Sequence, residues 1–282
     1  MAELKQMSQS PGPIGVFDSG YGGLTIYSEI QRMMPEYDFI YLGDNARAPY
    51  GTRSFDVVYE FTRQAVHHLF NSGCQLVILA CNTASAKALR NIQQIDLPGI
   101  DPRRRVLGII RPTVESIGEI TKSRHVGVLA TEGTIKSMSY PLEIRKLFPD
   151  ITVASEACPM WASLVEANEH LNPGADYFIK RDIEQLLSRD PDIDTIILGC
   201  THYPLLLDKI KQYVPNGITV LTQGHAVATA LQDYLKRHPE MDKLCTKGGN
   251  TIFRTTESDE RFREQASKFL NHDLRAQKIT LL

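Results

Sequence analysis

The chain has 282 residues, of which 42% are hydrophobic and 23% charged, and its 31 basic and 33 acidic residues leave a net charge of −2. This is the composition of an ordinary globular protein with room for one large domain or two, and it excludes a disordered chain. The near-neutral charge disfavours nucleic acid and anionic membranes as partners, so a small molecule is the expected ligand.

The N-terminal segment and the cysteines indicate in which cellular compartment the protein is expected. Residues 1–12 are polar, lack the apolar core of a signal peptide and are expected to form a disordered tail. No apolar run approaches the roughly 20 residues needed to cross a bilayer. The five cysteines are an odd number without an export signal, which predicts reduced thiols and a cytoplasmic protein.

Short apolar runs alternate with helical patterns along the whole chain. In the first part, strands are expected at 14–17, 39–42, 76–81 and 106–110, and helices at about 24–34, 55–71 and 84–95. In the second part, strands are expected at 125–130, 151–153, 196–200 and 219–221, a strand or hairpin at 251–254, and helices at about 161–168, 173–188, 204–213, 224–237 and 258–269. This alternation predicts an α/β fold with mainly parallel sheets and a domain boundary near residue 106.

One sequence pattern occurs twice. Leu76–Thr83 and Ile196–His202 each join a β-branched-rich apolar run to a small residue, a cysteine and polar residues. Ile14–Gly20 likewise resembles Val126–Gly133, and a hydroxyl residue precedes the cysteine by 62 residues in the first half and by 69 in the second. The chain is therefore expected to form two pseudo-symmetric domains of similar plan.

The repeat places Cys81 and Cys200 at the carboxyl ends of buried parallel strands, where ligand sites of such sheets lie. A pseudo-twofold arrangement would put the two cysteines on opposite walls of one interdomain cleft. A helix is expected to start after each cysteine, and its N-terminal amides would lower the pKa of the thiol. Cys74, Cys158 and Cys245 lack this setting and are expected to be inert core residues.

Two thiols on opposite walls suit the inversion of a stereocentre, which needs a base on one face of a carbon and an acid on the other. Backbone amides of the Gly-rich turns could donate hydrogen bonds to a substrate carboxylate, together with the side chains of Ser19, Asn82, Thr83 and Thr201. The sequence has no Cys-x-x-Cys pair, no His-x-x-x-His spacing and no lysine in a Schiff-base context, so neither a metal nor a cofactor is expected.

Four motifs between about residues 13 and 270 resemble those of the glutamate racemases in the aspartate/glutamate racemase superfamily: Asp18-Ser19-Gly20-Tyr21-Gly22-Gly23, Pro49-Tyr50-Gly51, Cys81-Asn82-Thr83 and Gly199-Cys200-Thr201-His202-Tyr203-Pro204. The resemblance implies cofactor-independent interconversion of L- and D-glutamate for peptidoglycan precursors. It also implies a domain at 106–218 inserted into one formed by 13–105 and 219–282, and a homodimer.

The resemblance implies roles for individual residues as well. Cys81 would act on the D-enantiomer and Cys200 on the L-enantiomer, with Asp18 and His202 tuning the thiols. The residues expected to hold the substrate are Asp18, Ser19, Tyr50, Gly51, Asn82, Thr83, Thr201 and His202. Asp44 and Glu166 occupy positions at which family members carry assisting carboxylates.

One segment departs from the family. Many relatives carry an Asp-Ser-Gly-like turn where this chain has Thr222-Gln223-Gly224-His225, and the segment is expected to pack near the hinge without affecting the chemistry.

The residues alone are also compatible with other functions. Aspartate racemase, or another isomerase of the superfamily, is the nearest alternative, although His202 after Thr201 favours glutamate because aspartate-type relatives tend to carry an acidic residue there. A non-catalytic amino-acid-binding protein would not need paired cysteines. An actin-like or kinase-like ATPase would use the Asp18–Gly20 turn as a phosphate loop, but that turn lacks the P-loop lysine.

Overall fold

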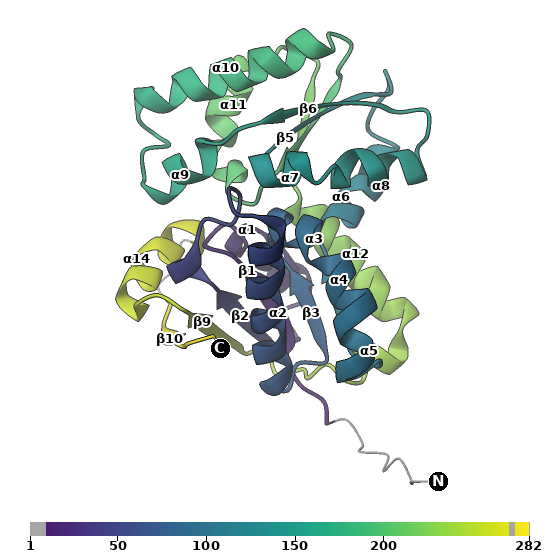
Figure 1. Ribbon diagram of the computed structural model, residues 1–282, viewed down its shortest axis with the longest axis vertical. Coiled ribbons are helices and arrows are strands. Elements are labelled where there is room, and N and C mark those ends of the chain that lie inside the picture. The colour runs from purple at the N-terminus through teal and green to yellow at the C-terminus, as the bar shows by residue number, and fades with distance from the viewer. Residues whose placement is uncertain (1–9, 271–273, 282) are drawn as a thin grey trace.

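The computed structural model describes residues 10–270 and 274–281, which form two α/β lobes connected by two crossings of the chain (Figure 1). Most of the tail expected at residues 1–12 lies outside the described residues. Gly12, however, pairs with Cys245, and its carbonyl accepts a hydrogen bond from the Thr246 amide at 2.9 Å. The folded part of the chain therefore begins before residue 13.

The first lobe is built on a six-stranded parallel sheet with the order β10-β9-β2-β1-β3-β4. Its strands are β1 (Ile14–Asp18), β2 (Phe39–Gly43), β3 (Leu76–Leu79), β4 (Arg105–Gly108), β9 (Thr251–Thr255) and β10 (Ala276–Lys278). Its helices are α1 (Leu24–Met33), α2 (Phe55–Asn71), α3 (Asn82–Lys87), α4 (Leu89–Asn91), α5 (Leu97–Ile100), α12 (Gly224–Arg237), α13 (Pro239–Asp242) and α14 (Asp259–Leu270), with a 3₁₀ turn η1 (Asn45–Arg47) and a π-helical turn η2 (Ile92–Asp96).

The second lobe is built on a four-stranded parallel sheet with the order β6-β5-β7-β8. Its strands are β5 (His125–Ala130), β6 (Thr152–Ala157), β7 (Thr195–Gly199) and β8 (Thr219–Leu221). Its helices are α6 (Ile110–Ile117), α7 (Glu132–Lys136), α8 (Ser139–Leu147), α9 (Trp161–Glu166), α10 (Pro173–Arg189) and α11 (Leu207–Tyr213), with a 3₁₀ turn η3 (Tyr203–Leu206).

The strand order β2-β1-β3-β4 of the first lobe recurs as β6-β5-β7-β8 in the second. The strands that end just before the two cysteines, β3 and β7, occupy equivalent places beside β1 and β5. The predicted fold class, with two lobes of similar plan and parallel sheets, is confirmed. Because both sheets are parallel, the polar residues that follow their strands gather at one edge of each sheet.

Helices cover both faces of each sheet, so both sides of a strand are buried. The strands are therefore continuous apolar runs in the sequence. In β1, Ile14 and Val16 point to the layer of α1 and α12, whereas Phe17 points to the layer of α2. In β7, Ile196 and Leu198 pack against α9 to α11, and Ile197 packs against α6 and α8. This alternation follows the two-residue period of a strand.

The lobe boundaries that follow from strand pairing differ from those expected from the sequence. β4 pairs with β3 in the first sheet, with Val77 opposite Val106, and β8 pairs with β7 in the second, with Thr195 opposite Thr219. Boundaries at 106 and 219 assign each strand to the wrong sheet, because the chain changes lobe after Gly108 and again after Leu221. A short apolar strand beside a connection carries no local signal of the sheet it joins.

Local structure departs from expectation at three places. The helix expected at 84–95 is divided into α3, α4 and the π-helical turn η2. The strand expected at 106–110 ends at Gly108, and Ile110 begins helix α6, because a short apolar run fits either structure. The segment 251–254 is a parallel strand next to β2 rather than half of a hairpin.

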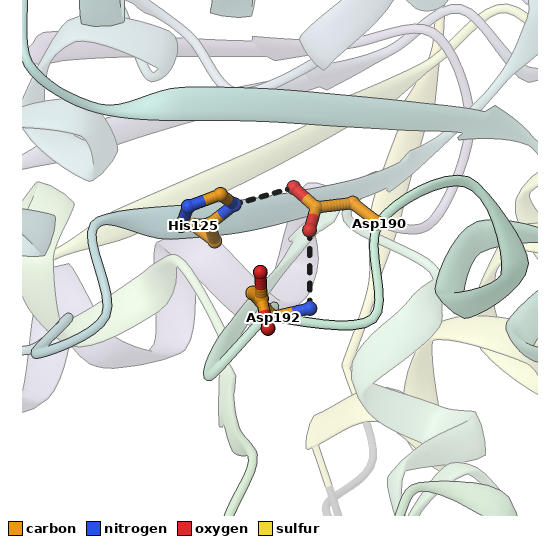
Figure 2. A group of neighbouring side chains, drawn as sticks. All are labelled: His125, Asp190 and Asp192. Carbon is orange, nitrogen blue, oxygen red and sulfur yellow. Dashed lines mark hydrogen bonds and ion pairs between the residues drawn. The ribbon is translucent and has the colours of Figure 1, made fainter.

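Polar contacts secure the edge of the second sheet away from the cysteines. His125, at the start of β5, bonds through Nδ1 to Asp190 Oδ2 at 2.8 Å, and Asp190 Oδ1 accepts from the Asp192 amide at 3.1 Å (Figure 2). Nearby, Asp194 accepts from the amides of Lys122 and Ser123, each at 2.6 Å. Asp190 and Asp194 therefore anchor the start of β5 and the turn that precedes it.

Among the described residues, no helix combines the length and the apolar composition that a membrane span requires.

Asp194→Asn should destabilise the protein at neutral pH by roughly 1–3 kcal/mol, because it weakens charge-assisted hydrogen bonds. Burial acts to raise the pKa of Asp194, but bonds from Ser123, Thr121 and Thr195 outweigh it and lower that pKa well below 3.8. The stabilisation is therefore present above about pH 3.8 and is lost as the pH falls through the folded-state value.

Chemical denaturation of both proteins across this pH range measures the effect. Asp233→Asn, which breaks only an exposed 3.5 Å ion pair with Lys236, is the control and should change little. A difference between wild type and Asp194→Asn that grows on acidification would contradict the assignment.

Candidate active site

Cys81 and Cys200 line a single cavity of about 60 Å³ between the two lobes. Each cysteine is only 6% exposed. The cavity is lined by Ser19, Pro49, Tyr50, Gly51, Thr52, Cys81, Asn82, Thr83, Thr131, Glu132, Pro159, Ala162, Ser163, Glu166, Cys200, Thr201 and His202. A larger cavity of about 740 Å³ lies between α3, α4, α6, α8 and α12, and neither cysteine lines it.

Cys81 caps helix α3, and its sulfur accepts a hydrogen bond from the Ala84 amide at 3.4 Å. Ser19 Oγ lies 3.2 Å from the same sulfur. Burial, together with the nearby Asp18, nevertheless raises the pKa of the Cys81 thiol to about 12, although the bonds to Ser19 and to the Ala84 amide act to lower it. The helix-start amide therefore acts in the expected direction, but the expected net lowering of this pKa is wrong, because burial and a neighbouring acid outweigh it.

Cys200 has a different neighbour. The residues after it form the 3₁₀ turn η3 rather than the start of an α-helix, so the expected helix end is absent at this cysteine. Instead, His202 Nδ1 lies 3.8 Å from Cys200 Sγ, and His202 Nε2 lies 3.1 Å from Glu166 Oε1. Cys200, His202 and Glu166 thus form a connected chain of groups on one wall of the cavity.

The charge of His202 follows from these contacts. Burial acts to lower the pKa of the imidazole, but its bonds to Cys200 and Glu166 outweigh burial and raise that pKa well above 6.5. Burial likewise acts to raise the pKa of Glu166, and the bond to His202 brings it below 4.5. At neutral pH the site therefore holds an imidazolium between the Glu166 carboxylate and the Cys200 sulfur.

Asp18 lies behind the cavity wall rather than in it. The side chain is 1% exposed, and Asp18 Oδ2 accepts from the Gly20 amide at 3.0 Å. Asp18 Oδ1 has no hydrogen-bond partner among the described residues. Burial raises the pKa of this carboxyl, and the charge of His202 opposes that shift. Asp18 can thus act on the thiols through its charge, while contact with a substrate requires a change in its surroundings.

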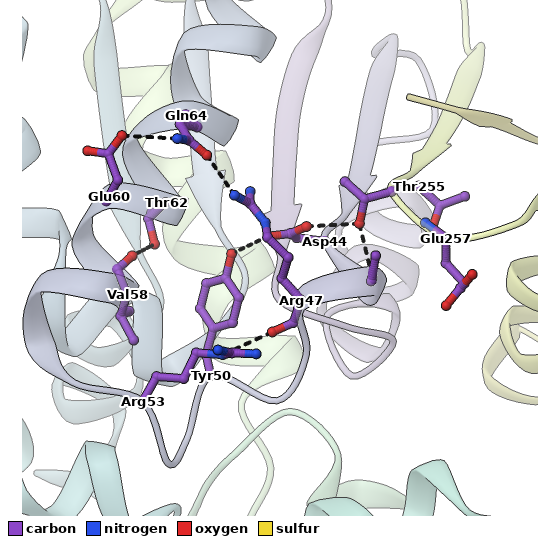
Figure 3. A network of polar contacts seen from close by, with 12 residues as sticks. Asp44, Arg47, Tyr50, Arg53, Val58, Glu60, Thr62, Gln64, Thr255 and Glu257 are labelled. Carbon is purple, nitrogen blue, oxygen red and sulfur yellow. Dashed lines mark hydrogen bonds and ion pairs between the residues drawn. The ribbon is translucent and has the colours of Figure 1, made fainter. Parts of the chain in front are cut away.

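Tyr50 lines the cavity, and Asp44 lies behind it (Figure 3). The Tyr50 hydroxyl donates to Asp44 Oδ2, and Arg47 Nε donates to the same oxygen at 2.7 Å. Thr256 Oγ1 donates to Asp44 Oδ1 at 2.8 Å. Asp44 is fully buried and has partners on both oxygens, so it holds the Tyr50 ring in place and does not reach the cavity.

The Gly-rich turn after β1 brings the first lobe against the second. A Cβ atom at Gly22 would lie 2.5 Å from His202 Nδ1 and 2.6 Å from Thr201 Oγ1. A Cβ atom at Gly20 would lie 2.9 Å from Glu166 Oε1. The absence of a side chain at Gly20 and at Gly22 therefore lets the backbone of the turn approach the Cys200 wall closely.

A second contact between the lobes is made of hydroxyl groups. Thr83 Oγ1, at the start of α3, lies 3.0 Å from Thr131 Oγ1, which caps α7. Gly51 also reaches this place, since its carbonyl accepts from the Gly133 amide at 2.8 Å. Thr131 follows β5 as Ser19 follows β1, so the sequence repeat could have identified it as a site residue.

Asn82 lines the cavity, but its side-chain amide is turned toward the hinge. Asn82 Nδ2 donates to Gln223 Oε1 at 2.5 Å, and Asn82 Oδ1 accepts from the Tyr140 hydroxyl at 2.8 Å. The sequence predicts that the Asn82 side chain donates a hydrogen bond to the substrate, but both of its polar atoms are bonded to Gln223 and Tyr140 instead. Gln223 lies in the segment that departs from the family, which therefore reaches the residue next to Cys81.

The structure brings most of the predicted site residues to one cavity: Ser19, Tyr50, Gly51, Cys81, Asn82, Thr83, Glu166, Cys200, Thr201 and His202. Asp18 and Asp44 are buried behind it. The sequence analysis did not include Thr52, Thr131, Glu132, Pro159, Ala162 and Ser163 in the site, although all of them line the cavity.

The family model described as Asp/Glu/Hydantoin racemase matches residues 14–231. The chain belongs to this family. It is 37% identical to a glutamate racemase of Ruegeria sp. (strain TM1040), over 93% of this chain and 97% of that relative. The expectation that the four motifs raised about the family is thereby confirmed.

Two solved structures resemble the whole molecule. A glutamate racemase isoform from Bacillus anthracis superimposes with a TM-score of 0.85 at 33% identity, covering 96% of this chain and 98% of that one. A glutamate racemase from Francisella tularensis in complex with D-glutamate superimposes with a TM-score of 0.83 at 32% identity, covering 95% and 97% of the two chains.

The two site cysteines should react differently with iodoacetamide in the absence of substrate. Cys200 should be alkylated first near pH 7, because burial raises the pKa of Cys81 to about 12, whereas Cys200 has His202 Nδ1 at 3.8 Å from its sulfur. Peptide mass spectrometry over a time course measures both rates, and Cys74, Cys158 and Cys245, buried away from the cavity, are internal controls. Faster alkylation of Cys81 than of Cys200 would contradict the raised pKa of Cys81.

Proposed function

We propose that this chain is a glutamate racemase that interconverts L- and D-glutamate without a cofactor, with Cys81 and Cys200 as its two bases. The observation that carries the proposal is that two cysteines from equivalent strands of the two lobes line the same small cavity. The similarity to glutamate racemases over nearly the whole chain supports the choice of substrate.

In the reaction, one thiolate removes the proton from the α-carbon of glutamate, and the thiol on the other side gives its proton to the opposite face. The carbon is thereby inverted, and the two cysteines exchange protonation states. Hydrogen-bond donors at the strand ends, including Ser19, Thr83 and Thr201, would stabilise the negative charge that develops on the substrate carboxylate. The retained ammonium group of the substrate adds to this stabilisation.

The two cysteines have unequal settings. Cys81 is disfavoured as a thiolate, since burial and Asp18 raise its pKa, whereas Cys200 faces His202, which is bonded to Glu166. The family resemblance assigns Cys200 to the L-enantiomer and Cys81 to the D-enantiomer. Each turnover exchanges the protonation states of the two cysteines, and they must be exchanged again before the same enantiomer can react.

The biological setting follows from the same family. D-Glutamate made by this reaction would supply the precursors of peptidoglycan, and hence cell-wall synthesis and cell shape. The described cysteines, all of them free, fit a reducing compartment such as the cytoplasm.

Cys81→Ala and Cys200→Ala should each lower the racemisation rate by at least about 10³-fold, because each removes one of two obligatory proton carriers. The rate is measured by circular dichroism of L- or D-glutamate. Cys158→Ala, which removes a buried cysteine outside the cavity, is the control for the loss of a thiol. Near-normal racemisation by either site variant would rule out the two-base mechanism.

The substrate is tested by comparing L-glutamate with L-aspartate in the same assay. We expect racemisation of glutamate, and at most slow turnover of aspartate. Activity with aspartate alone would replace glutamate racemase by the alternative, aspartate racemase. Binding of either amino acid without turnover would instead favour a non-catalytic binding protein.

A further inference from the structure

The carboxamide of Gln223 is completely enclosed at the hinge between the lobes. Gln223 is 2% exposed and precedes helix α12, at the point where the chain returns from the second lobe to the first. Its partners come from three separate helices: Asn82 in α3, Thr113 in α6 and Tyr140 in α8. One side chain thus joins the first lobe to two helices of the second.

The hydrogen bonds of this cluster connect all four side chains. Gln223 Nε2 lies 2.9 Å from Thr113 Oγ1, 2.8 Å from the Tyr140 hydroxyl and 3.2 Å from Asn82 Oδ1, and the two shorter contacts account for its two protons. The Tyr140 hydroxyl donates to Asn82 Oδ1 at 2.8 Å, and Asn82 Nδ2 returns a bond to Gln223 Oε1. The Thr113 hydroxyl in turn donates a hydrogen bond to the Ile109 carbonyl at 2.8 Å.

Few side chains could replace Gln223 in this cluster. The position needs two donors and one acceptor on a single planar group, which an amide provides and a hydroxyl does not. Burial also raises the pKa of Tyr140, so the phenol stays protonated and keeps its bond to Asn82. Thr113, Tyr140 and Asn82 are each at most 2% exposed, so water cannot take the place of a lost partner without entering the core.

The cluster is connected to the chemistry through Asn82. This residue directly follows Cys81 and is the first residue of α3, whose N-terminal cap is the Cys81 sulfur. The corresponding residue after Cys200 is Thr201, whose carbonyl accepts a bond from Thr25 Oγ1 and for which the described residues show no hydrogen bond to Gln223. The Tyr140 ring also reaches the second cysteine, since a Cβ atom at Gly199, the residue before Cys200, would lie 3.1 Å from Tyr140 Cε2. A change at Gln223 therefore acts on Cys81 through hydrogen bonds to its neighbour Asn82, and on Cys200 only through the packing of the Tyr140 ring.

We propose that Gln223 is a positioning residue that couples the arrangement of the lobes to the placement of Cys81, and so supports the half-reaction of Cys81 more strongly than that of Cys200. The inference depends on the proposed racemase function. It assigns a role in the reaction to the segment that departs from the family pattern.

Steady-state racemisation cannot reveal this asymmetry, because kcat/KM must be equal in the two directions when the equilibrium constant is one. A reaction that needs a single base can reveal it. With 3-chloroglutamate, the thiolate takes the α-proton, the released electron pair forms the Cα–Cβ double bond and chloride leaves. The enamine product hydrolyses to 2-oxoglutarate and ammonium, which are measured enzymatically.

The experiment places Gln223→Met in two backgrounds. In Cys200→Ala, where Cys81 is the remaining base, elimination from the enantiomer that Cys81 serves should fall about tenfold or more, because displacements of about 1 Å are costly in catalysis. In Cys81→Ala, elimination through Cys200 should stay within about twofold. Gln223→Glu keeps the acceptor for Asn82 Nδ2 and should retain more Cys81 activity than Gln223→Met.

A second readout needs no turnover. In the otherwise unmodified chain, Gln223→Met should change the iodoacetamide alkylation rate of Cys81 and leave that of Cys200 unchanged. Gln212→Met makes the same chemical change at an exposed position of α11 and should alter neither rate. Thermal unfolding of each variant confirms that it is folded at the assay temperature.

Equal effects on both cysteines, or no effect on either in the alkylation assay, would overturn the inference while leaving the racemase function intact. Absence of glutamate racemisation by the unmodified chain would overturn the proposed function and this inference with it.

Discussion

The site depends on two parallel sheets that meet at their carboxyl ends. Each sheet orders its strands so that the one before a cysteine, β3 or β7, lies beside the first strand of its lobe. Parallel pairing then sends both cysteines toward the same space, which is the cavity between the lobes. The glycine-rich turn, the threonine contact and the Gln223 cluster all serve to keep the two sheet edges at this spacing.

The two halves agree in topology but differ in electrostatics. Cys81 has a hydroxyl, a backbone amide and a buried acid around it, and Cys200 has an imidazolium backed by a carboxylate. A symmetric pair of thiols would have equal surroundings, whereas in this pair burial and Asp18 raise the pKa of Cys81 and an imidazolium faces Cys200. The similarity between the halves therefore sets the geometry, and the differences between them make the two thiols chemically unequal.

Much of this arrangement could be predicted from the sequence because it is local or repeated. The runs before Cys81 and Cys200 identify buried strands, and the motifs around them identify the family. The contacts that sequence reasoning missed join residues far apart in the chain. Gln223 meets Asn82 only because α12 returns to the first lobe, and the high pKa of Cys81 arises from burial beside Asp18, which no local pattern reports.

The central claim is that two sulfur atoms act on opposite faces of one carbon, and the label pattern of early turnover in deuterated water tests it most directly. L-Glutamate is incubated with the enzyme to a few per cent conversion, and both enantiomers are then separated and analysed by mass spectrometry. The account predicts deuterium at the α-carbon of the D-glutamate formed, while the recovered L-glutamate keeps its proton. Product that retains the substrate's own proton would contradict the account, because a single group would then have moved that proton between faces.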